Sequence, residues 1–110
     1  MTSFEIREYQ DSKGYSPFTD WFNRLDAKAA LKVNTYITRV GNGNFSNVKS
    51  LSSGISEIKI NWASGYRVYF AKDGKKLIIL LAGGTKKRQQ KDIEVAKNYW
   101  LDYKKRKSNA

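Results

Sequence analysis

The spacing of apolar residues changes once along this chain of 110 residues, close to residue 55. Between residues 17 and 40, apolar side chains recur every three or four positions, as they do on the buried side of a helix. Between 55 and 70 they alternate with polar ones, and a nearly all-apolar run follows at 77–81. This order predicts two helices followed by three successive antiparallel strands, which is an α+β arrangement.

Local signals mark the ends of the first elements. Residues 4–9 alternate apolar and polar, which predicts a half-buried strand ahead of the helices. Ser16 before Pro17 is typical of a helix start, because serine can cap the helix and proline needs no amide partner there. Asp26 can cap the second helix, whose apolar stripe stops at Gly41. The pair is predicted to form a helical hairpin.

In the second half of the chain, the signals for loops and turns are less regularly spaced. Residues 43–54 are rich in Asn, Ser and Gly and predict a loop. Asp73-Gly74 is a dipeptide favoured in tight hairpins. The run at 77–81 predicts a central strand that is covered on both faces or lines a cleft with one of them. A C-terminal helix is expected from Thr85 onward, with residues 104–110 as a basic, flexible tail. We therefore expect one domain, residues 1–110, in which a small, largely antiparallel sheet packs on the helical hairpin.

The charge of the chain favours an anionic partner. Lys and Arg number 21 against 10 Asp and Glu, a net charge of +11. Residues 1–54 carry a net +2 and residues 55–110 a net +9, so the second half is expected to make the contact. Nucleic acid and an anionic membrane surface are the partners that such an asymmetry supports.

Residue types that are missing narrow the chemistry. The chain has no cysteine and no histidine, which excludes disulfides, Cys nucleophiles and every His-dependent acid–base pair. We expect no metal and no cofactor, and proton transfer would fall to Lys, Tyr, Asp, Glu or water. No apolar run approaches the roughly 20 residues of a membrane span, and the N-terminus lacks the pattern of a signal peptide. A cytoplasmic protein with no membrane contact is expected.

Four cations, Lys86, Lys87, Arg88 and Lys91, lie at the predicted start of the C-terminal helix. Their sign opposes the helix dipole, which favours acidic residues in a first turn by roughly 0.3–1 kcal/mol each. Such a conflict with a local rule is frequent at functional sites, and free backbone amides with lysines would attract phosphate. The alternative is a solvated basic loop, with the helix beginning later, near Asp92.

Strand alternation places further cations beside this segment. If Ile58, Ile60 and Val68 face the helices, then Glu57, Lys59, Arg67 and Tyr69 point to the other, open face, which Lys86 can reach from the end of its strand. Arg67 stands out, because its guanidinium is always charged and grips phosphate with two hydrogen bonds. Its open position predicts that Arg67→Ala leaves the fold intact. The alternative for each of these cations is that it is exposed on a solvated sheet face and binds no ligand. The alternative for a tyrosine such as Tyr69 is that it packs within the sheet, as aromatic residues in strands usually do.

Several motifs in the second half together resemble one family. These are the strand GYRVYF (65–70), the Gly-Gly-x-Lys turn ending at Lys86, and the segment Gln89–Ile93 that opens the last helix. With residues 55–60 and 96–100, they are similar to the HigB-like, phage-Gp49-like branch of the RelE/ParE toxin superfamily. The resemblance implies a β-α-α-β-β-β fold with a C-terminal helix, and a helix-turn-helix antitoxin as partner, through which operator DNA would be bound.

Nuclease members of that superfamily enter the ribosomal decoding site and cleave mRNA, generally with basic and tyrosine side chains and without a metal. The resemblance carries that role onto Lys59, Arg67, Lys86 and Gln89. From the basic segment and the strand face described above, Lys87, Arg88, Lys91 and Tyr69 are expected to bind RNA. This sequence departs from the family pattern because it lacks the histidine that some relatives have near the last helix. The general acid is therefore unassigned.

The sequence therefore predicts a type II toxin that acts as a ribosome-dependent, metal-independent endoribonuclease. The 2′-hydroxyl of the RNA would attack its own phosphate, leaving a 5′-hydroxyl on the downstream fragment. Arg67 would stabilise the developing charge, Lys59 or Lys86 would relay the proton, and Gln89 would orient the phosphate or a base. The rivals are a ParE-like gyrase inhibitor without nuclease activity, a nucleic-acid-binding module that cleaves nothing, and, more weakly, a protein that associates with a membrane surface.

Overall fold

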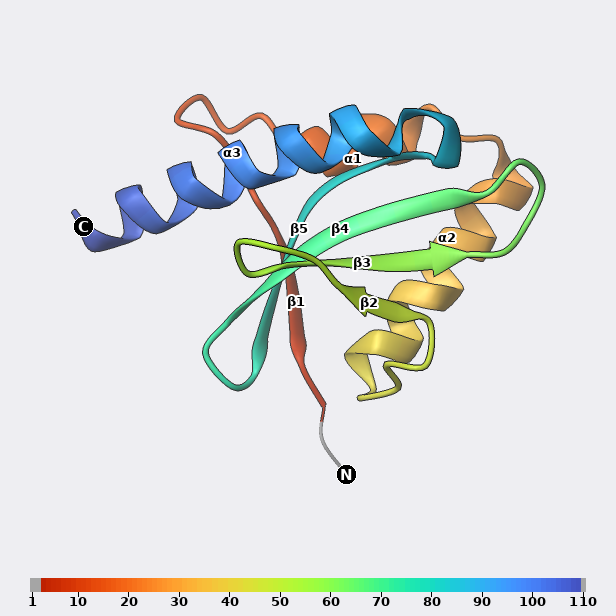
Figure 1. Cartoon of the computed structure of the whole chain (residues 1–110), viewed down its shortest axis with the longest axis horizontal. Coiled ribbons are helices and arrows are strands. Elements are labelled where there is room, and N and C mark those ends of the chain that lie inside the picture. Colours follow the sequence, from red (N-terminus) through yellow and green to blue (C-terminus); the bar gives the residue numbers. More distant parts are fainter. Residues whose placement is uncertain (1–2, 110) are drawn as a thin grey trace.

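The computed structural model describes residues 3–109 as an α+β fold with one sheet (Figure 1). The predicted order of elements is confirmed, with one additional strand. In chain order the elements are β1 (Glu5–Glu8), α1 (Pro17–Asn23), α2 (Ala27–Gly41), β2 (Val48–Ser50), β3 (Ile55–Ile60), β4 (Tyr66–Asp73), β5 (Leu77–Thr85), a 3-10 turn η1 (Lys86–Arg88) and α3 (Gln89–Ser108).

The sheet has the order β1-β5-β4-β3-β2. β1 runs parallel to β5, and every other neighbouring pair is antiparallel, as expected for a largely antiparallel sheet. The prediction of a plain loop at 43–54 is wrong in part, because Val48–Ser50 pair with residues 56–58 of β3 as a short edge strand. This strand has only three residues, of which two are exposed, so its alternation of apolar and polar residues is too short to be recognised in the sequence.

Both predicted helix caps form. The Ser16 hydroxyl accepts a hydrogen bond from the backbone N–H of Thr19 at 3.1 Å, and the Asp26 carboxylate accepts one from that of Ala29 at 2.8 Å. Each cap satisfies an amide that the first turn of a helix leaves without a partner. The caps thereby fix where the helical hairpin begins and turns.

The helical hairpin covers one face of the sheet. Side chains from β3, β4 and β5 that point to this face are fully buried against it, with Phe70 and Ile78 among the largest. Opposite them, α2 contributes Val33, Ile37 and Val40, at the helical spacing seen in the sequence. No helix among residues 3–109 has both the length and the apolar character required to cross a bilayer.

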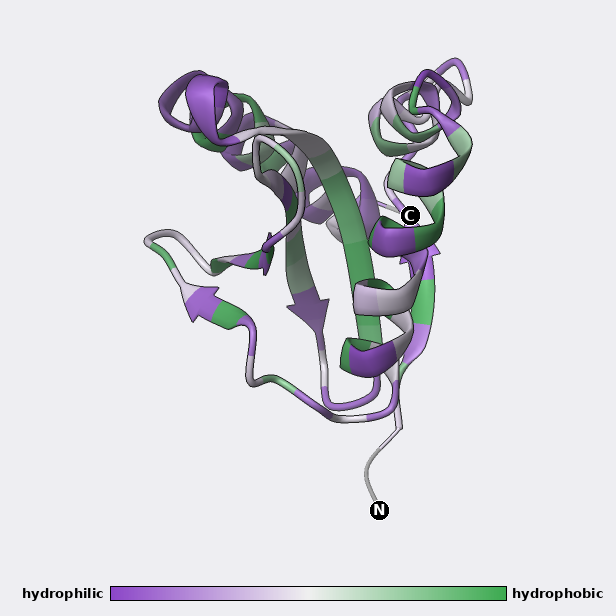
Figure 2. Ribbon diagram, turned by 90° about the vertical axis from the view of Figure 1, so that its right-hand side faces the viewer, coloured by the Kyte–Doolittle hydropathy of each residue, from purple (hydrophilic) through white to green (hydrophobic). Residues whose placement is uncertain are grey.

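The second face is covered as well, by α3, so the prediction of an open face is wrong. Strand alternation assigns the faces correctly, since Tyr69 and Ala71 lie opposite to Val68 and Phe70. Ala96 and Trp100 of α3 pack onto this face together with Ile79 and Leu81. Figure 2 shows one long central strand that is green along most of its length. The all-apolar run is therefore a central strand buried on both sides.

Gly83 and Gly84 belong to β5 and do not form the predicted turn. A Cβ at Gly83 would overlap the ring of Trp21 on α1, and one at Gly84 would overlap the carboxylate of Asp92 on α3. The two glycines thus let a helix approach each face of the same strand. Close helix packing explains this dipeptide without any ligand.

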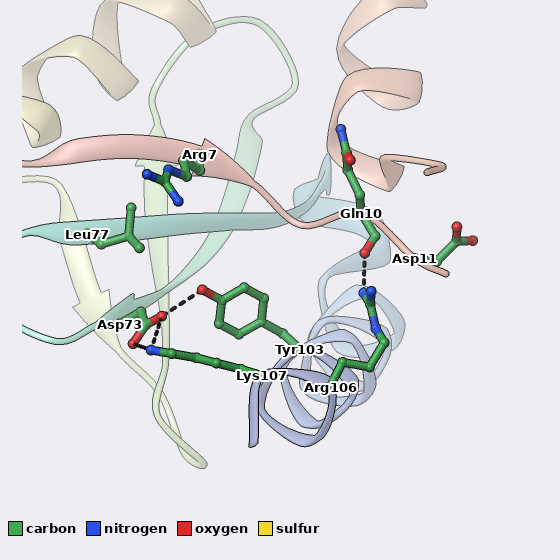
Figure 3. A pocket seen from close by; sticks show the side chains of 8 residues that line it. All are labelled: Arg7, Gln10, Asp11, Asp73, Leu77, Tyr103, Arg106 and Lys107. Carbon is green, nitrogen blue, oxygen red and sulfur yellow. Dashed lines mark hydrogen bonds and ion pairs between the residues drawn. The ribbon is translucent and has the colours of Figure 1, made fainter. Parts of the chain in front are cut away.

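Residues 104–110, expected as a basic, flexible tail, are helical as far as Ser108, and residue 110 lies outside the described residues. Lys104 to Ser108 complete the last turns of α3. A hollow of about 490 Å³ lies beneath this end of the helix, and Figure 3 shows Tyr103 and Lys107 paired with Asp73 on its wall. Asp73 accepts hydrogen bonds from the Tyr103 hydroxyl at 2.6 Å and from Lys107 Nζ at 2.6 and 2.7 Å. These contacts hold the helix end against the β4–β5 hairpin.

Candidate functional site

Three of the four predicted catalytic residues lie where β3 and β5 end and β4 and α3 begin, at the upper right of Figure 1. Lys59 and Arg67 are direct partners across the β3–β4 pair. The backbone N–H of Lys86 donates to the carbonyl of Gly65 at 3.1 Å, which ties the turn after β5 to the β3–β4 turn. A Cβ added at Gly65 would lie 3.5 Å from both Arg67 Nη1 and Lys86 Cβ. The Arg67 guanidinium and the first carbon of the Lys86 side chain therefore converge at Gly65.

Arg67 is buried rather than open, with 6% of its surface exposed. Its Nη1 donates a hydrogen bond to the carbonyl of Tyr66 at 3.1 Å. Its Nε lies 3.5 Å from Glu57 Oε1, which is ion-pair distance, but the geometry leaves that Nε–H without a hydrogen bond. The guanidinium is thus held near the start of the central strand β4, and one carboxylate compensates part of its charge.

Gln89, the fourth predicted catalytic residue, is the first residue of α3, and its side chain reaches down onto the sheet. Its Nε2 donates to Glu57 Oε1 at 2.6 Å. The same carboxylate oxygen therefore contacts Gln89 and Arg67. The amide donor of Gln89 points toward the protein interior in this state, not toward a bound phosphate.

Tyr69 does not lie on an accessible surface, which corrects the expectation for this residue. It has no exposed surface, and its hydroxyl has no hydrogen-bond partner. Burial raises the pKa of Tyr69 strongly, and the nearby Glu57 and Asp92 raise it further. Its ring packs on Ala82 and the base of α3, so contact between Tyr69 and RNA would require the helix to move.

The helix start falls between the two predicted positions. Lys86–Arg88 form the 3-10 turn η1, and α3 begins at Gln89 rather than at Thr85 or Asp92. Lys86, Lys87, Arg88 and Lys91 are all exposed, and no ion pair within residues 3–109 joins them to a carboxylate. Asp92, in the first turn of α3, supplies the acidic residue that the helix dipole favours.

Asp92 is a half-buried carboxyl group near the site. Its Oδ2 is inaccessible and has no hydrogen-bond partner in the described structure. Burial raises the pKa of Asp92, while the positive charges of Arg88 and Lys91 act in the opposite direction. Asp92 Oδ2 contacts the backbone at Gly84, and the cations at the start of α3 lie nearby. Because substrate cannot reach this oxygen, we assign Asp92 to packing and charge balance rather than to catalysis.

The arrangement can attract and polarise a phosphate, but it does not show a complete acid–base pair. The exposed cations would draw in polyanions, and Arg67 and Lys86 could stabilise charge that develops on phosphate oxygens. Glu57 and Tyr69 are both buried, which leaves Lys59 and Lys86 as the accessible groups for proton transfer at this site. Within residues 3–109, no three potential Asp or Glu metal ligands come together.

Glu57 and Asp92 are the two acidic residues beside the site that the sequence did not single out for a role. One signal was present for Glu57: Ile55, Tyr69, Ala71, Ile79 and Leu81 share its face of the sheet and are apolar, which indicates a covered face. For Asp92 the signal is its neighbour Gly84, a residue type that often marks a close approach. Neither signal shows which partner lies opposite.

Two comparisons with known proteins bear on identity. The family model described as "Phage derived protein Gp49-like (DUF891)" matches residues 20–100. A relative from Haemophilus influenzae (strain ATCC 51907 / DSM 11121 / KW20 / Rd), whose name is "Uncharacterized protein", is 43% identical over 81 residues. That alignment covers 73% of this chain and 82% of the relative. The family match spans α1 to Trp100 and so includes the whole site.

Proposed function

The chain belongs to the Gp49-like family of phage-derived proteins, which is associated with toxins of the RelE/HigB type, and from this we propose that it is the toxin of a type II toxin–antitoxin system. In this proposal the toxin is a ribosome-dependent endoribonuclease that cleaves mRNA without a metal. The observation that carries it is the convergence of Arg67 and Lys86 at Gly65, beside a segment of exposed cations.

The proposed reaction is an internal transfer at phosphorus. The ribose 2′-hydroxyl loses its proton and attacks the adjacent phosphate, and the bond to the 5′-oxygen of the next nucleotide breaks as that oxygen gains a proton. The products are a 2′,3′-cyclic phosphate and a 5′-hydroxyl. Arg67 and Lys86 would stabilise the charge on the phosphate oxygens, and Lys59 or Lys86 would relay the proton.

Burial of the site explains why the ribosome would be needed. Arg67 is 6% exposed and Gln89 is bonded to Glu57, so free RNA meets only the outer cations. Alignment of the substrate inside a ribosome would supply what the isolated chain lacks, since positioning alone contributes roughly 7–11 kcal/mol in well-oriented reactions. The proposed partners are therefore the ribosome with its mRNA and a helix-turn-helix antitoxin that also binds operator DNA, all in the cytoplasm.

A gyrase inhibitor of the same superfamily is the second candidate function. The burial of Arg67 and the inward bond of Gln89 favour it, because both side chains are better placed to hold the fold than to meet a phosphate. Such a toxin would cause DNA damage signalling and would leave mRNA intact.

The test compares two exposed lysines, one in the turn η1 and one in the last part of α3. Lys86→Ala removes a cation at the convergence point, and Lys105→Ala removes an equally exposed cation near the other end of α3. We expect growth inhibition and mRNA ends carrying a 5′-hydroxyl to be lost with Lys86→Ala and kept with Lys105→Ala. Equal loss in both variants would indicate general attraction to nucleic acid, and growth inhibition without mRNA cleavage would favour gyrase.

A further inference from the structure

Glu57 lies directly beneath the proposed site, and its side chain has no exposed surface. Its Oε1 accepts a hydrogen bond from Gln89 Nε2 at 2.6 Å and lies 3.5 Å from Arg67 Nε. Gln89 opens α3 and Arg67 lies on β4, so one oxygen atom links the helix start to the sheet. The second oxygen, Oε2, is buried without a hydrogen-bond partner.

A carboxylate in this place has a cost that packing alone does not explain. A buried charge is strongly unfavourable unless it is paired and hydrogen-bonded, and a hydrophobic residue of similar volume would often serve the fold as well. Glu57 shares its face of β3 with Ile55, which is fully buried in the apolar cluster under α3. What distinguishes Glu57 is its contact with two long, flexible side chains that would otherwise occupy many rotamers.

We infer that Glu57 is a positioning residue, whose buried carboxylate fixes the Arg67 guanidinium and the Gln89 amide relative to the RNA phosphate. This inference rests on the proposed nuclease function. Glu57 cannot touch the substrate itself, because its side chain is completely covered. It acts through Arg67 and Gln89, and it also compensates part of the charge of Arg67.

Three variants test the inference. Glu57→Asp keeps the charge that Arg67 faces but withdraws the carboxylate by one methylene. Glu57→Gln keeps the length and removes the charge. Asp92→Asn is the control, because the Asp92 carboxyl group also has a buried oxygen near the site, yet no hydrogen bond or ion pair among residues 3–109 joins it to Arg67 or Gln89.

The first measurement is the steady-state cleavage of mRNA on purified ribosomes. We expect kcat to fall on the order of 100-fold in Glu57→Asp, the loss that a misplacement of about 1 Å can cause, while KM stays unchanged. Glu57→Gln, if it folds, should show the same pattern, and Asp92→Asn should retain both constants. A fall in kcat that matches the unfolded fraction seen by circular dichroism, or an equal fall in Asp92→Asn, would overturn the inference.

The second measurement does not depend on cleavage. Hydrogen exchange of the Gln89 side-chain amide, followed by NMR on ¹⁵N-labelled protein, should become faster in Glu57→Asp and stay slow in Asp92→Asn. Unchanged exchange in Glu57→Asp refutes the positioning contact, whether or not the protein cleaves RNA. Faster exchange together with a wild-type chain that cuts no mRNA refutes the proposed function and supports the contact between Glu57 and Gln89.

Discussion

Replacing Arg67 by alanine should destabilise the protein severely, since it leaves the Glu57 carboxylate buried without its cation. Glu57 has no exposed surface and Arg67 only 6%, so water cannot easily take the place of the guanidinium. Removing one partner of a buried ion pair typically costs about 3–5 kcal/mol. The remaining hydrogen bond from Gln89 stabilises the carboxylate, so we expect a loss near the lower limit, about 3 kcal/mol.

Urea denaturation at pH 7, followed by tryptophan fluorescence, measures this loss. With a slope of roughly 1–2 kcal/mol per molar for a small domain, the midpoint should fall by about 1.5–3 M. The double variant Arg67→Ala with Glu57→Gln removes the unpaired charge and should recover a substantial part of the loss. A single variant that loses less than about 1 kcal/mol, or a double variant no more stable than the single one, would refute the buried-pair account. Lost toxicity in Arg67→Ala alone therefore cannot identify a catalytic residue.

Three further predictions concern packing and pH. Gly83→Ala should destabilise by about 1–3 kcal/mol, because the added methyl overlaps the Trp21 ring; an unchanged Tm would show that α1 can shift freely. Burial raises the pKa of Asp92, so its contribution to stability is present below the unfolded pKa of about 3.9 and is lost as pH rises through the folded pKa. Asp92→Asn should flatten this fall in urea midpoints above about pH 4, and parallel curves for the two proteins would contradict it. Hydrogen bonding from Lys107 lowers the pKa of Asp73, so the stability that this pair contributes is present above the unfolded pKa and is lost as pH falls through the folded pKa. Lys107→Ala should weaken this loss of stability in acid, followed by circular dichroism below about pH 4. Identical titration curves for the wild type and the variant would rule out the pairing.

Much of the fold follows from local rules that this sequence obeys. The Ser16 and Asp26 caps, the alternation in β3 and β4, and the apolar run of β5 each predict the element that the structure contains. Alternation also assigns the correct face to Arg67 and Tyr69, because successive strand residues always point to opposite sides. These features depend on neighbours in the chain and are therefore visible in the sequence.

The exposure of the site residues depends on tertiary packing, which local rules do not determine. Alternation cannot tell whether α3 lies across the face that carries Arg67 and Tyr69. Two residues that could have shown it, Gly84 and Glu57, acquire their meaning only from partners distant in sequence, Asp92 and Gln89. The roles of the predicted catalytic residues remain predictions, although their meeting at one end of the sheet could be anticipated from strand order.

The most direct test of the central claim compares where mRNA is cut with and without ribosomes. Purified wild-type protein is added to a translating extract and, separately, to the same purified transcript, and the 5′ ends of the products are mapped. We predict efficient cuts in phase with codons in the extract and little cleavage of the naked transcript. Identical cuts without ribosomes would contradict the ribosome-dependent mechanism, and absence of cuts in both reactions would contradict the nuclease proposal itself.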